Sequence, residues 1–180
     1  MSLLGQLAQV PRLFGLPIVV GAIERSIAAD HFRMNSPEIP DKEIRRLTQA
    51  AAFMSAVESA DLWMREYASV EVATLIAEDT HDVKETIQSF HQGYTNPDGS
   101  TQFEGRPIFR TFHIVESVLY AKKQDALLLQ LADHCAFIVK RKLMDRPEFE
   151  ELYWKIEPQI HSTTDPPKSA HILIPRKTHR

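Results

Sequence analysis

Gln130 and Asp133 are the residues of this 180-residue chain whose type and spacing most directly suggest chemistry. They stand three positions apart in the otherwise apolar stretch LLLQLADHCAFIV (residues 127–139), so a helix would place both on one face. A helix that is apolar nearly all round belongs in a protein interior. A buried carboxylate protonates, pairs with a basic group or binds a metal ion. Two interpretations follow: a structural bond, for example to Arg110, and a metal-binding or catalytic role.

A second pair of acids, Glu78 and Asp79, ends the apolar run VEVATLIAED (residues 70–79), which is typical of a buried strand. In parallel α/β sheets, ligands bind at the carboxyl ends of the strands. Because side chains alternate along a strand, we expect at most one of the two carboxylates to face such a site. Acids are also common in the turn before a helix, so a purely local role is the favoured interpretation on the residues alone.

Other familiar chemical motifs are missing from the sequence. It has no CxxC, HExxH or paired-histidine spacing for zinc, no phosphate-binding glycine loop and no GxSxG turn. We therefore expect His134 and Cys135 to pack or cap rather than to bind zinc. The short basic run KRK (residues 140–142) is expected to complement the end of a helix, with nucleic-acid phosphates as its second interpretation.

The composition is that of an ordinary globular domain. Charged residues make up 25% and the net charge is −3, which argues against a protein that coats nucleic acid but leaves room for a local basic patch. One cysteine cannot form an internal disulfide, and no apolar run reaches the length of a membrane helix, so we expect a cytoplasmic protein that does not enter the membrane. We predict one domain over residues 1–160 and an irregular tail over 161–180.

Helical and strand patterns alternate along the chain. We predict helices at 2–14, 41–67, 81–92, 126–143 and 146–156, strands at 16–24, 70–79 and 109–121, and connections at 25–40 and 93–107. The segment HILI (171–174) is expected to be irregular or to add an edge strand. Alternation of this kind favours a mostly parallel sheet covered by helices, although three strands are few for such a sheet.

The stretch LLLQLADHCAFIVKRKL resembles the C-terminal Gln-x-x-Asp motif of the bacterial domain-of-unknown-function 3800 family. The segments LFGLPIVVGAIER and VATLIAED are also similar to central strands of that family. The resemblance implies an α/β, ribonuclease H-like three-layer domain whose short, mostly parallel sheet is flanked by helices. The family's Asp-Glu pair on a first strand has no counterpart in the opening MSLLGQLAQV, so we expect a domain that lacks the first strand or hairpin.

The same resemblance implies a divalent-metal-dependent nuclease, in a family with some members linked to mobile elements and phage defence. Asp133, with Asp79 or Glu78, would bind Mg²⁺ or Mn²⁺, while Gln130 would position water or substrate. The absent first-strand ligand supports an alternative, a non-catalytic interaction or regulatory protein with a degenerate metal site. The expected partners are nucleic acid and a second copy of the chain bound through an exposed sheet edge.

Overall fold

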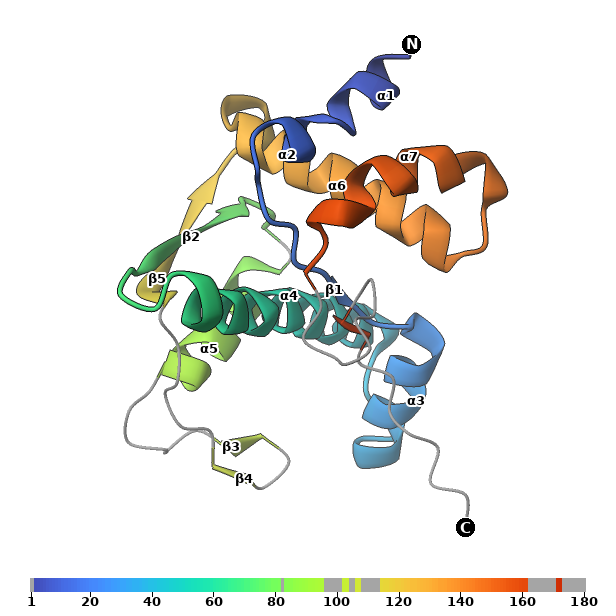
Figure 1. The fold of residues 1–180 in the computed structure, drawn as a ribbon. Coiled ribbons are helices and arrows are strands. Elements are labelled where there is room, and N and C mark those ends of the chain that lie inside the picture. The colour runs from blue at the N-terminus through green and yellow to red at the C-terminus, as the bar shows by residue number, and fades with distance from the viewer. Residues whose placement is uncertain are drawn as a thin grey trace.

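The computed structural model describes residues 2–81, 83–95, 102–103, 106–107, 114–161 and 171–172 of the chain. It is a mixed α/β structure, mostly helical, with a short parallel two-stranded sheet (Figure 1). In chain order the elements are α1 (Leu3–Leu7), α2 (Val10–Leu13), β1 (Gly21–Ala22), α3 (Arg25–Asn35), α4 (Asp41–Tyr67), β2 (Ala73–Glu78), α5 (Lys84–Thr95), β3 (Gln102–Phe103), β4 (Arg106–Pro107), β5 (Ile114–Ala121), η1 (Lys123–Asp125), α6 (Leu127–Leu143), η2 (Pro147–Phe149), α7 (Glu150–Ile156), η3 (Glu157–Gln159) and β6 (His171–Ile172).

The strands of the described residues form three separate pairs rather than the single sheet expected from the sequence. β2 pairs with β5 in parallel, β1 pairs with β6 in parallel, and β3 pairs with β4 antiparallel. The short β1–β6 pair agrees with an added strand in HILI. The β2–β5 pair ends in the register Glu78↔Ala121, so Glu78 lies next to the turn that leads into α6.

β1 is held against α4 by the closeness of the two backbones. A Cβ atom on Gly21 would lie 2.3 Å from the Ala52 carbonyl oxygen and 2.4 Å from the Ala56 nitrogen, so only glycine fits at this position. The predicted strand 16–24 therefore forms only a two-residue strand at Gly21–Ala22 and an isolated parallel bridge between Ile18 and Ile160. β1 thus lies against α4 and pairs with β6 instead of extending the β2–β5 sheet.

Helix α4 has the bounds that the sequence predicts and organises one half of the core. Met54 and Val57 pack with Ala73 and Leu75 of the sheet segment. Ala50 packs with Val83 and Ile87 beside and within α5, and Phe53 contributes to both clusters. Pro40 is the N-cap residue, and it makes no side-chain capping bond.

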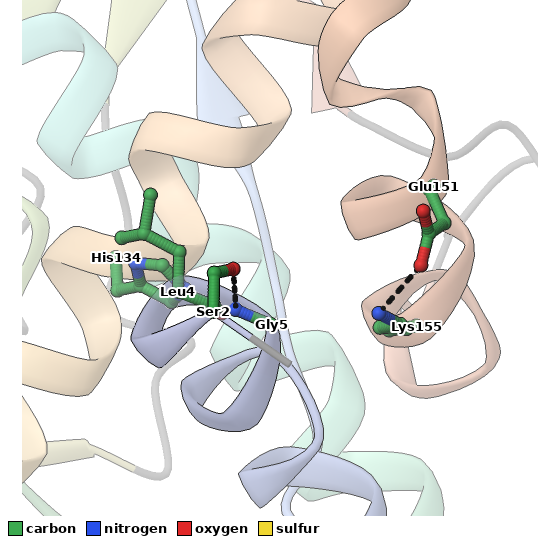
Figure 2. A network of polar contacts seen from close by, with 6 residues as sticks. All are labelled: Ser2, Leu4, Gly5, His134, Glu151 and Lys155. Atoms are coloured by element: carbon green, nitrogen blue, oxygen red, sulfur yellow. Dashed lines mark hydrogen bonds and ion pairs between the residues drawn. The ribbon is translucent and has the colours of Figure 1, made fainter.

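The second half of the core lies between α6 and α7 and beside the end of α1, and Figure 1 shows these helices above α4. Its buried residues are Ala8, Cys135, Ile138, Val139, Tyr153 and Ile156. Ser2 caps α1 by accepting a hydrogen bond from the Gly5 N–H at 3.2 Å, and His134 Nε2 lies 3.2 Å from the Leu4 carbonyl oxygen (Figure 2). These contacts join the start of the chain to α6.

Two expectations about helices are wrong. Residues 25–40 do not simply connect two elements, because Arg25–Asn35 forms α3 and packs against α4. The prediction of a connection relied on the mixture of charge, serine and proline over 25–40, but both prolines of this segment, Pro37 and Pro40, follow the end of α3. The single helix predicted over residues 2–14 is divided into α1 and α2. Within the described ranges, no helix combines the length and apolar character needed to cross a membrane.

Candidate functional site

One groove is lined by candidate residues from two segments that are distant in the sequence, the end of β2 and α6. It has a volume of about 620 Å³ and lies between the chain that leads to β1, the middle of α4, the end of β2 and one side of α6. Apolar side chains, including Phe53, Leu129 and Val139, line most of it. Its carboxylates are Glu78 and Asp133, and we call it the carboxylate groove.

Asp133 is exposed, which corrects the expectation of a buried carboxylate. Its side chain is 59% exposed, and Oδ2 accepts a hydrogen bond from Lys123 Nζ at 2.5 Å. The rest of α6 explains the difference. His134, Cys135, Ile138 and Val139 face the core, while Leu127 and Leu128 are 80% and 69% exposed. α6 is therefore buried along one side only, despite its apolar sequence.

Gln130 and Asp133 act on the same short turn. The Gln130 side-chain amide donates to the carbonyl oxygens of Lys123 (3.1 Å) and Gln124 (3.4 Å), whereas Asp133 binds the Lys123 ammonium group. The Gln-x-x-Asp pair thus holds η1, which joins β5 to α6, by its backbone and by its side chain. The structural bond considered from the sequence is present, and Lys123 is its partner.

Lys123 is a member of the site that sequence reasoning missed. Its hydrogen bond to Asp133 raises the pKa of the ammonium group, and the charges of Asp133 and Glu78 add to this while partial desolvation opposes it. Glu78 is thus near enough to contribute although it lies on a different element. Lys123 lies ten positions before Asp133, and this spacing predicts no contact within a helix or a strand. The hydrogen bond between them depends on the path of η1.

Glu78 and Asp79 diverge, as strand alternation predicts. Glu78 is the acid of the pair that lines the groove. Asp79 instead accepts a 3.1 Å hydrogen bond from Lys84, whose ammonium group also lies 4.5 Å from the centre of the Tyr120 ring. The backbone N–H of Asp79 donates to the Ala121 carbonyl. Asp79 therefore joins the turn after β2 to α5 and β5.

The carboxylate groove offers a divalent cation two hard oxygen donors. Among the described residues, no three His, Cys, Asp or Glu side chains are grouped so that they could hold a metal ion by themselves. Mg²⁺, however, is commonly bound by one or two carboxylates together with substrate phosphates. Glu78 and Asp133 are the two carboxylates that line the groove, whereas Asp79 is not among its lining residues. Binding at Asp133 would require the Lys123 ammonium group to leave it.

The remaining candidates have structural contacts. Cys135 is a buried free thiol in the core, and burial raises its pKa to about 11. In the KRK run, Lys142 donates to Glu150 at 2.8 Å, and Arg141 lies over the rings of Phe137 and Phe149. Arg110 lies outside the described residues.

Comparison with known proteins finds no matching family model, no similar curated protein and no similar solved structure. The resemblance to the domain-of-unknown-function 3800 family therefore stays a prediction.

Proposed function

We propose that this chain is a ribonuclease H-like domain that hydrolyses nucleic-acid phosphodiesters with the help of Mg²⁺ or Mn²⁺. The observation that supports the proposal is the convergence of Glu78, from the carboxyl end of a parallel strand, and Asp133, from a helix, on one groove. This is the end of a parallel sheet at which ligands bind. Asp133 of the Gln-x-x-Asp motif, which carries the family resemblance, lines the groove, whereas Gln130 is not among its lining residues and binds the η1 backbone.

Each residue has a separate task in this proposal. Glu78 and Asp133 would hold the cation, which when bound activates water and neutralises phosphate charge. The Lys123 ammonium group would release the Asp133 carboxylate and bind a phosphate oxygen of the substrate instead, since it is exposed enough to move. Gln130 would keep η1 in place through the Lys123 carbonyl, which makes it a positioning residue rather than one that touches the reacting atoms.

Calorimetric titration with Mn²⁺ and a cleavage assay on DNA and RNA would test this function. We expect site-specific Mn²⁺ binding and metal-dependent cleavage by the wild type, with both lost in Asp133→Ala and Glu78→Gln. Asp79→Asn is the matched control, because its carboxylate is adjacent in sequence but bound to Lys84, and it should retain both. Equal activity of Asp133→Ala and wild type would refute the assigned role.

A second candidate function is supported by the Lys123–Asp133 bond itself. An ammonium group on the helix carboxylate supplies the positive charge that a metal ion would otherwise bring, as expected in a non-catalytic interaction protein with a degenerate site. In that case the wild type would bind no Mn²⁺ at a specific site, and Asp133→Ala would show the same absence of cleavage as the wild type.

A further inference from the structure

A second concave surface, separate from the carboxylate groove, is lined by three arginines. It has a volume of about 370 Å³ and lies between α3 and the first turns of α4. We call it the arginine cleft. Its lining residues are Arg25, Ala29, Arg33, Asp41, Ile44, Arg45 and Thr48.

The cleft is built from one face of each helix. On α3, positions 25, 29 and 33 are four residues apart, so Arg25 and Arg33 stand one turn on either side of the small Ala29. On α4, Ile44 and Thr48 are buried and form part of the lining, and the Thr48 hydroxyl donates to the Ile44 carbonyl at 2.7 Å. The lining thus combines a small and partly apolar set of side chains with guanidinium groups.

Positive charge in the cleft is only partly neutralised. Among the described residues that line it, Asp41 is the one acid, and it binds Arg33 at 2.7 Å. In the part of the chain that the structure describes, Arg25 and Arg45 make no hydrogen bond or ion pair. The neighbouring Arg46 differs, because it binds both Glu43 and Thr86 at 3.1 Å. Three guanidinium groups and one carboxylate leave a formal charge of +2 for a ligand to meet.

This arrangement selects the chemistry of the ligand. A guanidinium group is a planar fork of donors that matches the oxygens of a phosphate, and unpaired arginines lose little when they exchange water for such an anion. The chain as a whole is negative, at −3, so a local charge of +2 stands out against it. Phosphate groups are therefore the ligands that fit the cleft best.

Helix α4 links the two concave surfaces. Thr48 and Arg45 line the arginine cleft, whereas Phe53 and Ala56 line the carboxylate groove. At 1.5 Å of rise per residue, the two sets lie about 8–16 Å apart along the helix axis. With about 3.4 Å of axial rise per nucleotide, this separation corresponds to roughly 2–5 nucleotides of a strand.

We propose that the arginine cleft binds backbone phosphates of a nucleic-acid strand, a few nucleotides from the position that enters the carboxylate groove. This inference rests on the proposed function for its choice of nucleic acid as the source of the phosphates. It assigns Arg25, Arg33 and Arg45 to substrate binding and gives them no part in the chemical step.

Fluorescence anisotropy of a labelled 12-nucleotide single strand, in EDTA and without metal, tests the cleft independently of the carboxylates. Arg25→Ala and Arg45→Ala should each weaken binding about threefold to tenfold. The slope of log affinity against log salt should become shallower by about 0.7 for each phosphate that the variant no longer binds. Arg146→Ala is the control, because it removes one exposed arginine outside the cleft and should leave affinity unchanged.

Two further measurements complete the test. A labelled 5′-mononucleotide in place of the single strand separates a strand from an isolated phosphate, and the mononucleotide should bind much more weakly. Hydrogen exchange of the wild type should show protection of residues 41–48 by the strand, which keeps the test valid if a variant fails to fold. Equal affinity of wild type and cleft variants, no strand binding by the wild type, or equally tight mononucleotide binding would overturn the proposal. Failure of Mn²⁺-dependent cleavage alone would overturn the proposed function and leave this binding result unaffected.

Discussion

Helices α4 and α6 are the two longest of the described helices. From their sequences, an aspartate on the charged helix α4 would be exposed and one on the apolar helix α6 would be buried, but the structure shows the reverse. α4 is rich in charged residues, yet the Asp61 side chain is 2% exposed and is bound by Arg65 at 2.7 Å. α6 is far more apolar, yet Asp133 is 59% exposed beside Lys123. The chemical pairing is similar in the two places, and the solvation differs.

The difference follows from which sides of each helix its neighbours cover, since α6 also contacts several elements (α7, η1, η2 and β2) but is buried along one side. α4 contacts α3, α5, β1 and β6, so several of its sides are enclosed. α6 is covered mainly along the side that faces α1 and α7 (Figure 1). An aspartate on α4 therefore belongs to the packing of the fold, whereas an aspartate on α6 remains accessible to a ligand. This contrast favours Asp133 over Asp61 as a functional carboxylate.

Removal of the guanidinium group from the buried pair should have the largest effect. Arg65→Ala removes the guanidinium group that binds the buried Asp61 carboxylate, and should lower the free energy of unfolding by about 3 kcal/mol. Lys155→Ala is the control, because it removes the cation of an exposed pair with the same i,i+4 spacing and should cost about 0.3–0.5 kcal/mol (Figure 2). Urea unfolding of both variants measures the difference, and equal losses would contradict this account of α4.

The contact between α4 and β1 is the next most sensitive point. Gly21→Ala forces a Cβ against backbone atoms of Ala52 and Ala56, and should lower stability by about 1–3 kcal/mol. Gly15 provides a comparison, since it has a φ of +62° and open space around its Cα. Gly15→Ala should cost about 1 kcal/mol through backbone strain alone. Thermal unfolding distinguishes the two, and a neutral Gly21→Ala would mean that β1 can move away from α4.

Acid should weaken the half of the molecule that contains α4 through His91 of α5. Its side chain is 2% exposed, and burial lowers its pKa below the usual 6.5. Because the unfolded chain then binds the proton more readily, stability should fall as pH drops below about 6.5 and towards the folded pKa. Unfolding measured at pH 7.5 and pH 5 should show a smaller loss in His91→Gln than in the wild type. The same loss in both would assign the acid sensitivity to other groups.

Asp133→Ala should have the smallest effect on stability. Its ion pair with Lys123 is exposed, so the free energy of unfolding should change by less than about 1 kcal/mol. Comparison with Arg65→Ala under the same urea conditions tests the contrast between the two helices directly. A loss above about 2 kcal/mol would show that Asp133 supports the fold. A loss of activity in Asp133→Ala could then not be assigned to the site alone.

Local patterns determined the elements of this protein more fully than its site. The bounds of α4 agree with the sequence prediction at both ends, and β2, β5, α6 and α7 lie within or close to their predicted segments. The apolar period is a property of neighbouring residues, so it can be read from the chain. The same information also predicted that at most one of Glu78 and Asp79 would face the site.

Only the tertiary structure decided the environment of each functional side chain. The exposure of Asp133, its bond to Lys123 and its place in the same groove as Glu78 depend on how α6, η1 and β2 are placed relative to one another. The arginine cleft likewise exists because α3 packs on α4, and α3 lies in a segment that was predicted to be a connection. Periodicity states which side of a helix is apolar, but burial depends on which distant segments cover that side.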